Sequence, residues 1–158
     1  GDGITQSGFF RRATVRNGSI VGLGRDGVRL GLAARVRDIT SAESGRDGIV
    51  VGRGGIVERS FVYDSRDDGI VAGEACLIID NTIQLVDDNG LVVDEGCVVS
   101  RNIIQFSSTF AIVSTGATVE SGANNMVSNN GGSANPQIFG VGLVEIAPNI
   151  CGINAICP

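Results

Sequence analysis

Aliphatic residues recur along this chain at a fixed interval and alternate with other residues. A turn pair, Asp or Asn followed by Gly, returns at a constant interval as Asp26-Gly27, Asp47-Gly48, Asp68-Gly69 and Asn89-Gly90. The position after each pair is aliphatic, and so in most repeats is the position two further on. The first of these columns reads Val28, Ile49, Ile70, Leu91 and Ile112. Because strand side chains point alternately to opposite faces, this pattern predicts short strands that bury one side.

Other positions follow the same 21-residue register from Val15 to Val119. One aliphatic column reads Val15, Val36, Val57, Ile78 and Val99, and another reads Ile20, Ser41, Val62, Ile83 and Ile104. Several short strands in each repeat predict an all-β parallel β-helix, a β-solenoid in which each residue lies on its counterpart about 4.8 Å away. A leucine-rich repeat would need leucine columns, and the chain has seven leucines.

The parallel crossover rule favours a right-handed β-helix, and the length predicts about six coils. We expect coils over residues 1–131 and a C-terminal capping segment of the same domain over residues 132–158. Near the end of the register, a one-residue insertion would align Asn102 with Asn124.

Composition supports strands and removes several kinds of chemistry. Valine and isoleucine dominate the aliphatic residues and glycine is abundant, whereas histidine, tryptophan and lysine are absent. Histidine-based nucleophile pairs, histidine metal sites and phosphate-loop lysines are therefore excluded. The coils keep one length and carry no long loops that could wall a cleft. We expect a protein without catalytic activity and without a cofactor.

Charge and hydropathy limit the partners. The net charge is −5, which argues against nucleic acid, and no apolar run is long enough to span a membrane. Residues 1–66 carry a charge of +4 and residues 67–158 a charge of −9. The chain opens Gly1-Asp2-Gly3 without a methionine, which indicates processing or trimming.

Three segments carry a recognisable pattern, namely Gly-Ile-Val-Val-Gly-x-Gly at Gly48–Gly54, Asp80-Asn81-Thr82 and Arg101-Asn102-Ile103. They resemble the secreted bacterial right-handed parallel β-helix repeat proteins of the pectate-lyase-like superfamily. The tail from Asn129 to Pro158 is also similar to the ends of such proteins. The resemblance implies the fold and secretion, but it implies no particular activity, because most members of this kind have none assigned.

The four cysteines form two pairs in the sequence. Cys151 and Cys157 close a short loop, where we expect a disulfide, and that bond would indicate an extracellular or periplasmic location. Cys76 and Cys97 stand one full period apart in a column of small residues. Stacked Cβ atoms there are somewhat too far apart for an unstrained bond, so we expect two buried thiols.

Two columns carry charges that suggest chemistry. Asp38, Arg59, Asp80 and Arg101 alternate in sign, and stacked coils would pair them in a structural ladder, with a ligand-binding face as the alternative. The turn residues Asp67, Asp68, Asp87 and Asp88 could gather around Ca²⁺. Aspartates before glycine also bond their own turn backbone, and we prefer that simpler explanation to a metal.

Two apolar stripes should face outward, because their neighbours in each strand face inward. One stripe contains Val50, Val71, Val92 and Val113, and the other contains Ile56, Leu77 and Val98. Contiguous apolar stripes on a surface indicate association. The sequence therefore favours a structural or binding role through self-association as an oligomer or filament. The alternative is a domain that binds or cleaves polysaccharide, with or without calcium.

Overall fold

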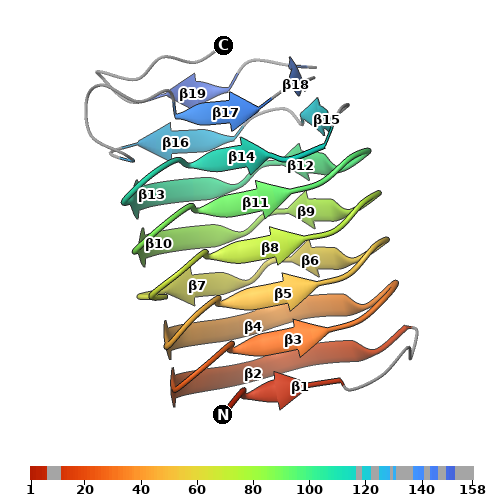
Figure 1. Ribbon diagram of the computed structural model, residues 1–158, viewed down its shortest axis with the longest axis vertical. Helices are drawn as coiled ribbons and strands as arrows, with labels where there is room; N and C mark the ends of the chain where they lie inside the picture. The colour runs from red at the N-terminus through yellow and green to blue at the C-terminus, as the bar shows by residue number, and fades with distance from the viewer. Residues whose placement is uncertain are drawn as a thin grey trace.

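The chain folds into a stack of similar coils that climbs from the N-terminus to the C-terminus (Figure 1). This computed structural model describes residues 1–6, 12–116, 119–121, 125–128, 130, 137–140, 143–145 and 149–151. Over these residues the regular structure is β-strand throughout, in about five turns with a 21-residue period. As the chain rises, the front strands run to the right and the rear strands to the left (Figure 1), which is a right-handed coil. The predicted parallel β-helix is confirmed.

One face of the stack is a seven-stranded parallel sheet that receives one short strand from each turn. Its strands, in spatial order, are β1 (Ile4–Thr5), β3 (Val28–Leu30), β5 (Ile49–Val51), β8 (Ile70–Ala72), β11 (Leu91–Val93), β14 (Ile112–Ser114) and β17 (Ile138–Gly140). The partners Val28, Ile49, Ile70, Leu91 and Ile112 lie side by side from turn to turn. The register read from the sequence is the register of this sheet.

The other two faces share a ten-stranded sheet. It begins with two long strands, β2 (Thr14–Leu23) and β4 (Arg35–Ser44). Later turns split into a first strand, β6 (Ile56–Glu58), β9 (Leu77–Ile79) or β12 (Val98–Ser100), and a second strand, β7 (Phe61–Tyr63), β10 (Thr82–Val86), β13 (Ile103–Ser107), β16 (Met126–Ser128) or β19 (Ile150–Cys151). The split falls next to a left-handed residue, Arg59 in the third turn (φ 47°) and Asp80 in the fourth (φ 57°).

The core fills the inside of the coil with stacked aliphatic side chains. Val36, Val57 and Ile78 are neighbours in the register and are fully buried. Burial alternates in the same way in the seven-stranded sheet. In each of the strands β3, β5, β8 and β11 the two end residues are buried and the middle residue is half-buried. Burial of each such side chain contributes roughly 1.5–3 kcal/mol, so the aliphatic columns are the main source of stability.

A column of buried asparagines runs beside the aliphatic core. The side-chain carbonyl of Asn102 accepts hydrogen bonds from the backbone N–H and the side-chain amide of Asn81, both at 3.0 Å. Asn125 accepts the same pair of bonds from Asn102. The amide of Asn102 also donates to the carbonyl oxygen of Ile78 at 2.9 Å. Each asparagine therefore satisfies polar groups of the preceding coil inside the core.

The alignment of Asn102 with Asn124 is wrong. Ile103 pairs with Met126, so Asn102 lies against Asn125, and the step is 23 residues. The sequence offers two adjacent asparagines at this point, and only the backbone register decides which one enters the column.

Strands in the C-terminal segment continue the stack. β17 pairs with β14, β18 (Leu143–Glu145) with β15 (Val119–Ser121), and β19 with β16, all in parallel. The described part of residues 132–158 thus adds strands to the existing faces. A capping boundary at residue 131 stays a prediction.

Cys76 and Cys97 form a disulfide between adjacent coils, so the expectation of two free thiols is wrong. Their Cα atoms lie 4.4 Å apart, within the range that a disulfide bridges. Neighbouring strands are about 4.8 Å apart in an ideal sheet. The two cysteines lie at a turn, where the coils approach more closely than that. The side chain of Cys151 and the whole of Cys157 lie outside the described residues, so their bond stays a prediction.

We predict that Asn102→Ala destabilises the fold by about 2–4 kcal/mol, because it leaves buried partners on two neighbouring coils unsatisfied. Urea unfolding followed by circular dichroism would measure the loss. The control is Gln105→Ala, since Gln105 is half-buried on the outer side of β13 and bonds Gln84 and Ser128 there. Equal losses in the two variants would contradict a special role for the buried column.

Candidate functional site

The first predicted stripe is an outer ridge of the seven-stranded sheet, here called the valine stripe. Val50, Val71, Val92 and Val113 are successive partners in the register, and each is half-buried. Arg29 precedes them and Phe139 follows them in the same row. Phe139 is 52% exposed and stacks on Phe110 with ring centroids 5.0 Å apart. The stripe is therefore continuous and ends in an aromatic pair, of which Phe139 is exposed and Phe110 half-buried.

The second predicted stripe faces outward from the first part of the ten-stranded sheet. Ile56, Leu77 and Val98 are register partners, each half-buried, and Arg35 lies before them. They alternate with the buried Val57, Ile78 and Val99, which confirms the orientation read from the sequence.

A third apolar surface was not identified from the sequence. It lies on the outer side of β7, β10, β13, β16 and β19. Its exposed residues are Phe61, Leu85, Ile103, Phe106, Met126 and Ile150. The signal was present in the column Phe61, Thr82, Ile103, but a polar member interrupts it and hides its apolar character.

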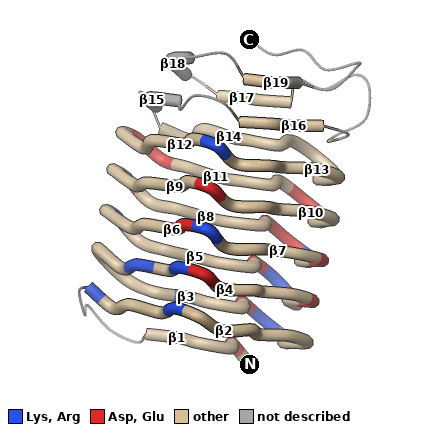
Figure 2. Tube along the Cα trace, turned by 180° about the vertical axis from the view of Figure 1, so that it is seen from behind, with Lys and Arg blue, Asp and Glu red and all other residues tan. Residues whose placement is uncertain are grey.

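The charge ladder is formed as two separate pairs. Arg59 donates two hydrogen bonds to Asp38, at 2.9 and 3.1 Å, and Arg101 donates two to Asp80, at 2.7 and 2.8 Å. Blue and red positions alternate up the middle of Figure 2 in the same way. Arg59 lowers the pKa of Asp38 below its usual value, and Arg37 adds to this effect. Arg101 lowers the pKa of Asp80 in the same way. These pairs are exposed, and exposed ion pairs add little to the stability of a fold.

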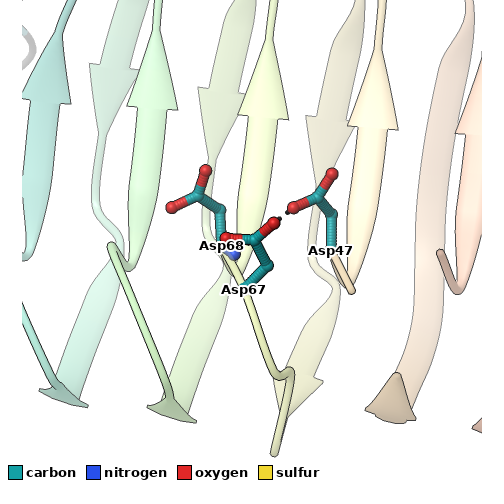
Figure 3. A group of neighbouring side chains, drawn as sticks. All are labelled: Asp47, Asp67 and Asp68. Atoms are coloured by element: carbon teal, nitrogen blue, oxygen red, sulfur yellow. Dashed lines mark hydrogen bonds between the residues drawn. The ribbon is translucent and has the colours of Figure 1, made fainter. Parts of the chain in front are cut away.

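The aspartates at the turn column form a smaller group than the one we expected. Asp47, Asp67 and Asp68 each place a carboxylate oxygen within 4.8 Å of the others (Figure 3). Among the described residues, Asp87 and Asp88 are not part of such a group. Asp47 replaces them because it is buried under the next turn, where its Oδ1 accepts the Asp68 N–H at 3.3 Å. We call Asp47, Asp67 and Asp68 the aspartate corner.

The aspartate corner holds carboxylates that repel one another. Burial raises the pKa of Asp47 to about 6, and the neighbouring carboxylates of Asp26, Asp67 and Asp68 add to the rise. Burial also raises the pKa of Asp68, although Asn89 opposes the rise through two hydrogen bonds. Arg29 forms an ion pair with Asp26, and its guanidinium lies 3.6 Å from the carboxylate of Asp47. It therefore offsets part of the negative charge at the Asp26 end of this turn column. Three carboxylates could coordinate a hard cation. An acidic group of this size also occurs without one, so it carries no metal assignment.

We predict that stability falls as the pH rises from about 4 to 7, because the folded chain holds a proton on Asp47 that the unfolded chain has already lost. A pKa near 6 against an ordinary value of 3.8 corresponds to about 1–3 kcal/mol once solvent screening at this corner is counted. Asp47→Asn should remove most of this dependence while keeping the acceptor for Asp68. Urea midpoints between pH 4 and 8 test this, with the exposed Asp87→Asn as control. A wild-type midpoint that rises over this range would contradict the prediction.

No helix that could cross a membrane occurs in the part of the chain that the structure describes. No protein-family model and no curated protein matches the sequence. Among solved structures, the chain is similar to the periplasmic alginate epimerase AlgG, with a TM-score of 0.73 and 15% sequence identity. The match covers 89% of this chain but 39% of the epimerase chain. A likeness at this identity shows the fold, and that fold is the one implied by the resemblance of the sequence to the pectate-lyase-like superfamily.

Proposed function

We propose that this chain is a non-catalytic β-helix that acts outside the cytoplasm through self-association along its outer apolar faces. The observation that carries the proposal is the unbroken valine stripe, which continues into the exposed ring of Phe139. Surface valines that occur singly need no explanation, whereas a contiguous row does.

The energy available from the stripe sets the strength of association. Covering the exposed half of each valine stabilises a complex by about 1 kcal/mol, so four valines contribute about 4 kcal/mol. Loss of translational and rotational freedom costs at least a similar amount. The stripe alone therefore supports weak association, and other surfaces must add to it.

Charge along the axis supplies a second contribution. Because sequence order is axial order in a solenoid, the charge of +4 on residues 1–66 and −9 on residues 67–158 makes the first half of the rod basic and the second half acidic, with most of the acidic charge in the middle turns. Blue positions accordingly gather on the lower turns of Figure 2 and red positions on the turns above them. Antiparallel side-by-side pairing brings the basic half of one copy against the acidic half of the other.

The disulfide supports a location outside the cytoplasm. Structural disulfides persist in oxidising compartments, and Cys76 and Cys97 are buried and bonded. The similar fold of AlgG, a protein described as periplasmic, is consistent with this proposal.

Polysaccharide binding is the second candidate, and the similar fold of an enzyme named for alginate favours it. The charge ladder is a poor anion-binding face, because Arg59 and Arg101 already pair with Asp38 and Asp80. We expect no change in melting temperature when alginate or polygalacturonate is added with CaCl₂. A clear upward shift that is lost in Asp88→Asn would favour this candidate over self-association.

We predict that the wild-type chain associates measurably between about 5 and about 500 µM at low salt, and less in about 0.5 M NaCl, which screens the charge contribution. Sedimentation velocity would measure it. Combined Val71→Lys and Val92→Lys should make the chain monomeric without lowering its melting temperature. Ser100→Lys, an outward half-buried position on β12 that belongs to none of the apolar surfaces, is the matched control. A wild-type chain that stays monomeric at the highest concentration would overturn the proposal.

A further inference from the structure

The third apolar surface consists of large side chains that the described part of the chain leaves uncovered. Its members expose between 36% and 62% of their area. Most of them come from β7, β10 and β13, which lie one above another on the left of Figure 1. Contact along the valine stripe would not cover them, because that stripe belongs to the seven-stranded sheet. The third apolar surface therefore needs an explanation of its own.

The outward side chains of these strands form two apolar rows with a row of amides between them. The first row is Phe61, Thr82, Ile103, Met126 and Ile150, and the second row is Leu85 and Phe106. Between the rows, Gln84 donates a hydrogen bond to Gln105 at 2.9 Å, and Gln105 donates one to Ser128 at 3.1 Å. Each glutamine amide uses one of its two N–H groups in this way, so the other is able to donate to a partner.

Charge is missing from this face. As far as the structure describes them, the outward side chains of β7, β10, β13, β16 and β19 include no charged residue, although 18% of the chain is charged. The buried centre of a protein–protein interface is likewise poor in charge and rich in aromatic residues and methionine. Phe61, Tyr63, Phe106 and Met126 give the third apolar surface that composition.

Exposed carboxylates border the surface on the side of its second row. Glu43 and Asp64 precede this row in the same column, and Asp87 follows the end of β10. None of the three forms an ion pair within the part of the chain that the structure describes. Arg66, two residues after Asp64, offsets one of these charges. The border therefore stays negative and suits a basic partner.

Two other occupants suit the surface less well. In the antiparallel pairing that the charge along the axis favours, a second copy would set the two acidic borders against each other. A bilayer would place the amide row against hydrocarbon, where the remaining N–H groups find no acceptor.

We propose that the third apolar surface binds an amphipathic helix of a partner protein, with basic side chains along the flank that faces Asp64 and Asp87. A helix rises about 5.4 Å per turn and neighbouring coils are about 4.8 Å apart, so apolar side chains on successive turns meet successive coils. The first row extends over about 19 Å, which a helix of about 13 residues spans. One polar side chain within its apolar face accepts from the amide row. This site lies on a different sheet from the valine stripe and does not depend on the proposed self-association.

Fluorescence anisotropy with labelled synthetic peptides tests the site on the whole chain. The probe is an amphipathic helix of about 14 residues, made of leucine and lysine with one glutamine in the centre of its apolar face. One control has the same residues in scrambled order, and the other has glutamate in place of lysine. We expect the probe to bind at micromolar concentration, at least about tenfold more tightly than either control. Equal binding of the scrambled peptide, or equal or tighter binding of the glutamate helix, would overturn the proposal.

Variants locate the bound helix. Ile103→Thr repeats the Thr82 of the preceding coil, and Phe106→Asn suits the left-handed backbone at its position (φ 60°). We expect each to weaken binding of the probe at least about fivefold, because a few side chains at the centre of an interface carry most of the binding energy. Ile56→Thr on β6 is the matched control and should leave binding intact. Unchanged binding in a folded double variant of Ile103 and Phe106 would overturn the proposal.

Two further measurements separate this site from the alternatives. The chain that carries both Val71→Lys and Val92→Lys should bind the probe as the wild type does, so a failure here is distinct from a failure of self-association. Cosedimentation with phosphatidylcholine vesicles tests a lipid surface. Pelleting that is lost in Ile103→Thr, together with no preference among the peptides, would assign the surface to lipid and overturn the proposal.

Discussion

Parallel hydrogen bonding between coils of equal length is the constraint on which the rest of this structure depends. At the turn that starts each front strand, the N–H of Gly27, Gly48 and Gly69 donates to the carbonyl oxygen of the residue before the next glycine, at 2.9–3.0 Å. A coil with one extra residue would move its inward side chains to the outside. The repeat therefore keeps its 21-residue period where the core is continuous, and the longer step between Asn102 and Asn125 comes after the regular turns.

The same register places every residue next to the residues of its own column in the coils above and below. A column is therefore stable when its side chains attract one another and strained when they repel. Amides gain from stacking, because each can donate to and accept from its neighbours, as Asn81, Asn102 and Asn125 do. Carboxylates repel one another when they are stacked, and at Asp47 burial, with this repulsion added to it, raises the pKa. The repulsion in the turn column is reduced at both ends. Arg29 pairs with Asp26 at one end, and Asn89 stands in place of a fourth aspartate at the other.

Periodicity made the columns predictable, because it fixes which residues share a row and which face each points to. The buried columns, the outward valines and the pairing of Arg59 with Asp38 all follow from that register. Distances within a row do not follow from it. Close approach at a turn brought Cys76 and Cys97 into bonding range, and burial selected Asp47 for the aspartate corner. The choice of Asn125 over its neighbour depended on backbone register beyond the regular repeat. These outcomes depend on a few ångströms that spacing along the chain does not encode.

A uniform coil also determines where binding can arise. Because the interior is filled by stacked side chains, a ligand or a second copy can only meet the outer columns, and each column can change from coil to coil without altering the fold. The column of Gly22, Glu43, Asp64, Leu85 and Phe106 passes from small to acidic to apolar while four of its members keep a left-handed backbone near φ 54–60°. Its first three members help line a polar hollow, and its last two belong to an exposed apolar surface. Substitution along one column is therefore enough to give a single rod two chemically different surfaces, one polar and one apolar.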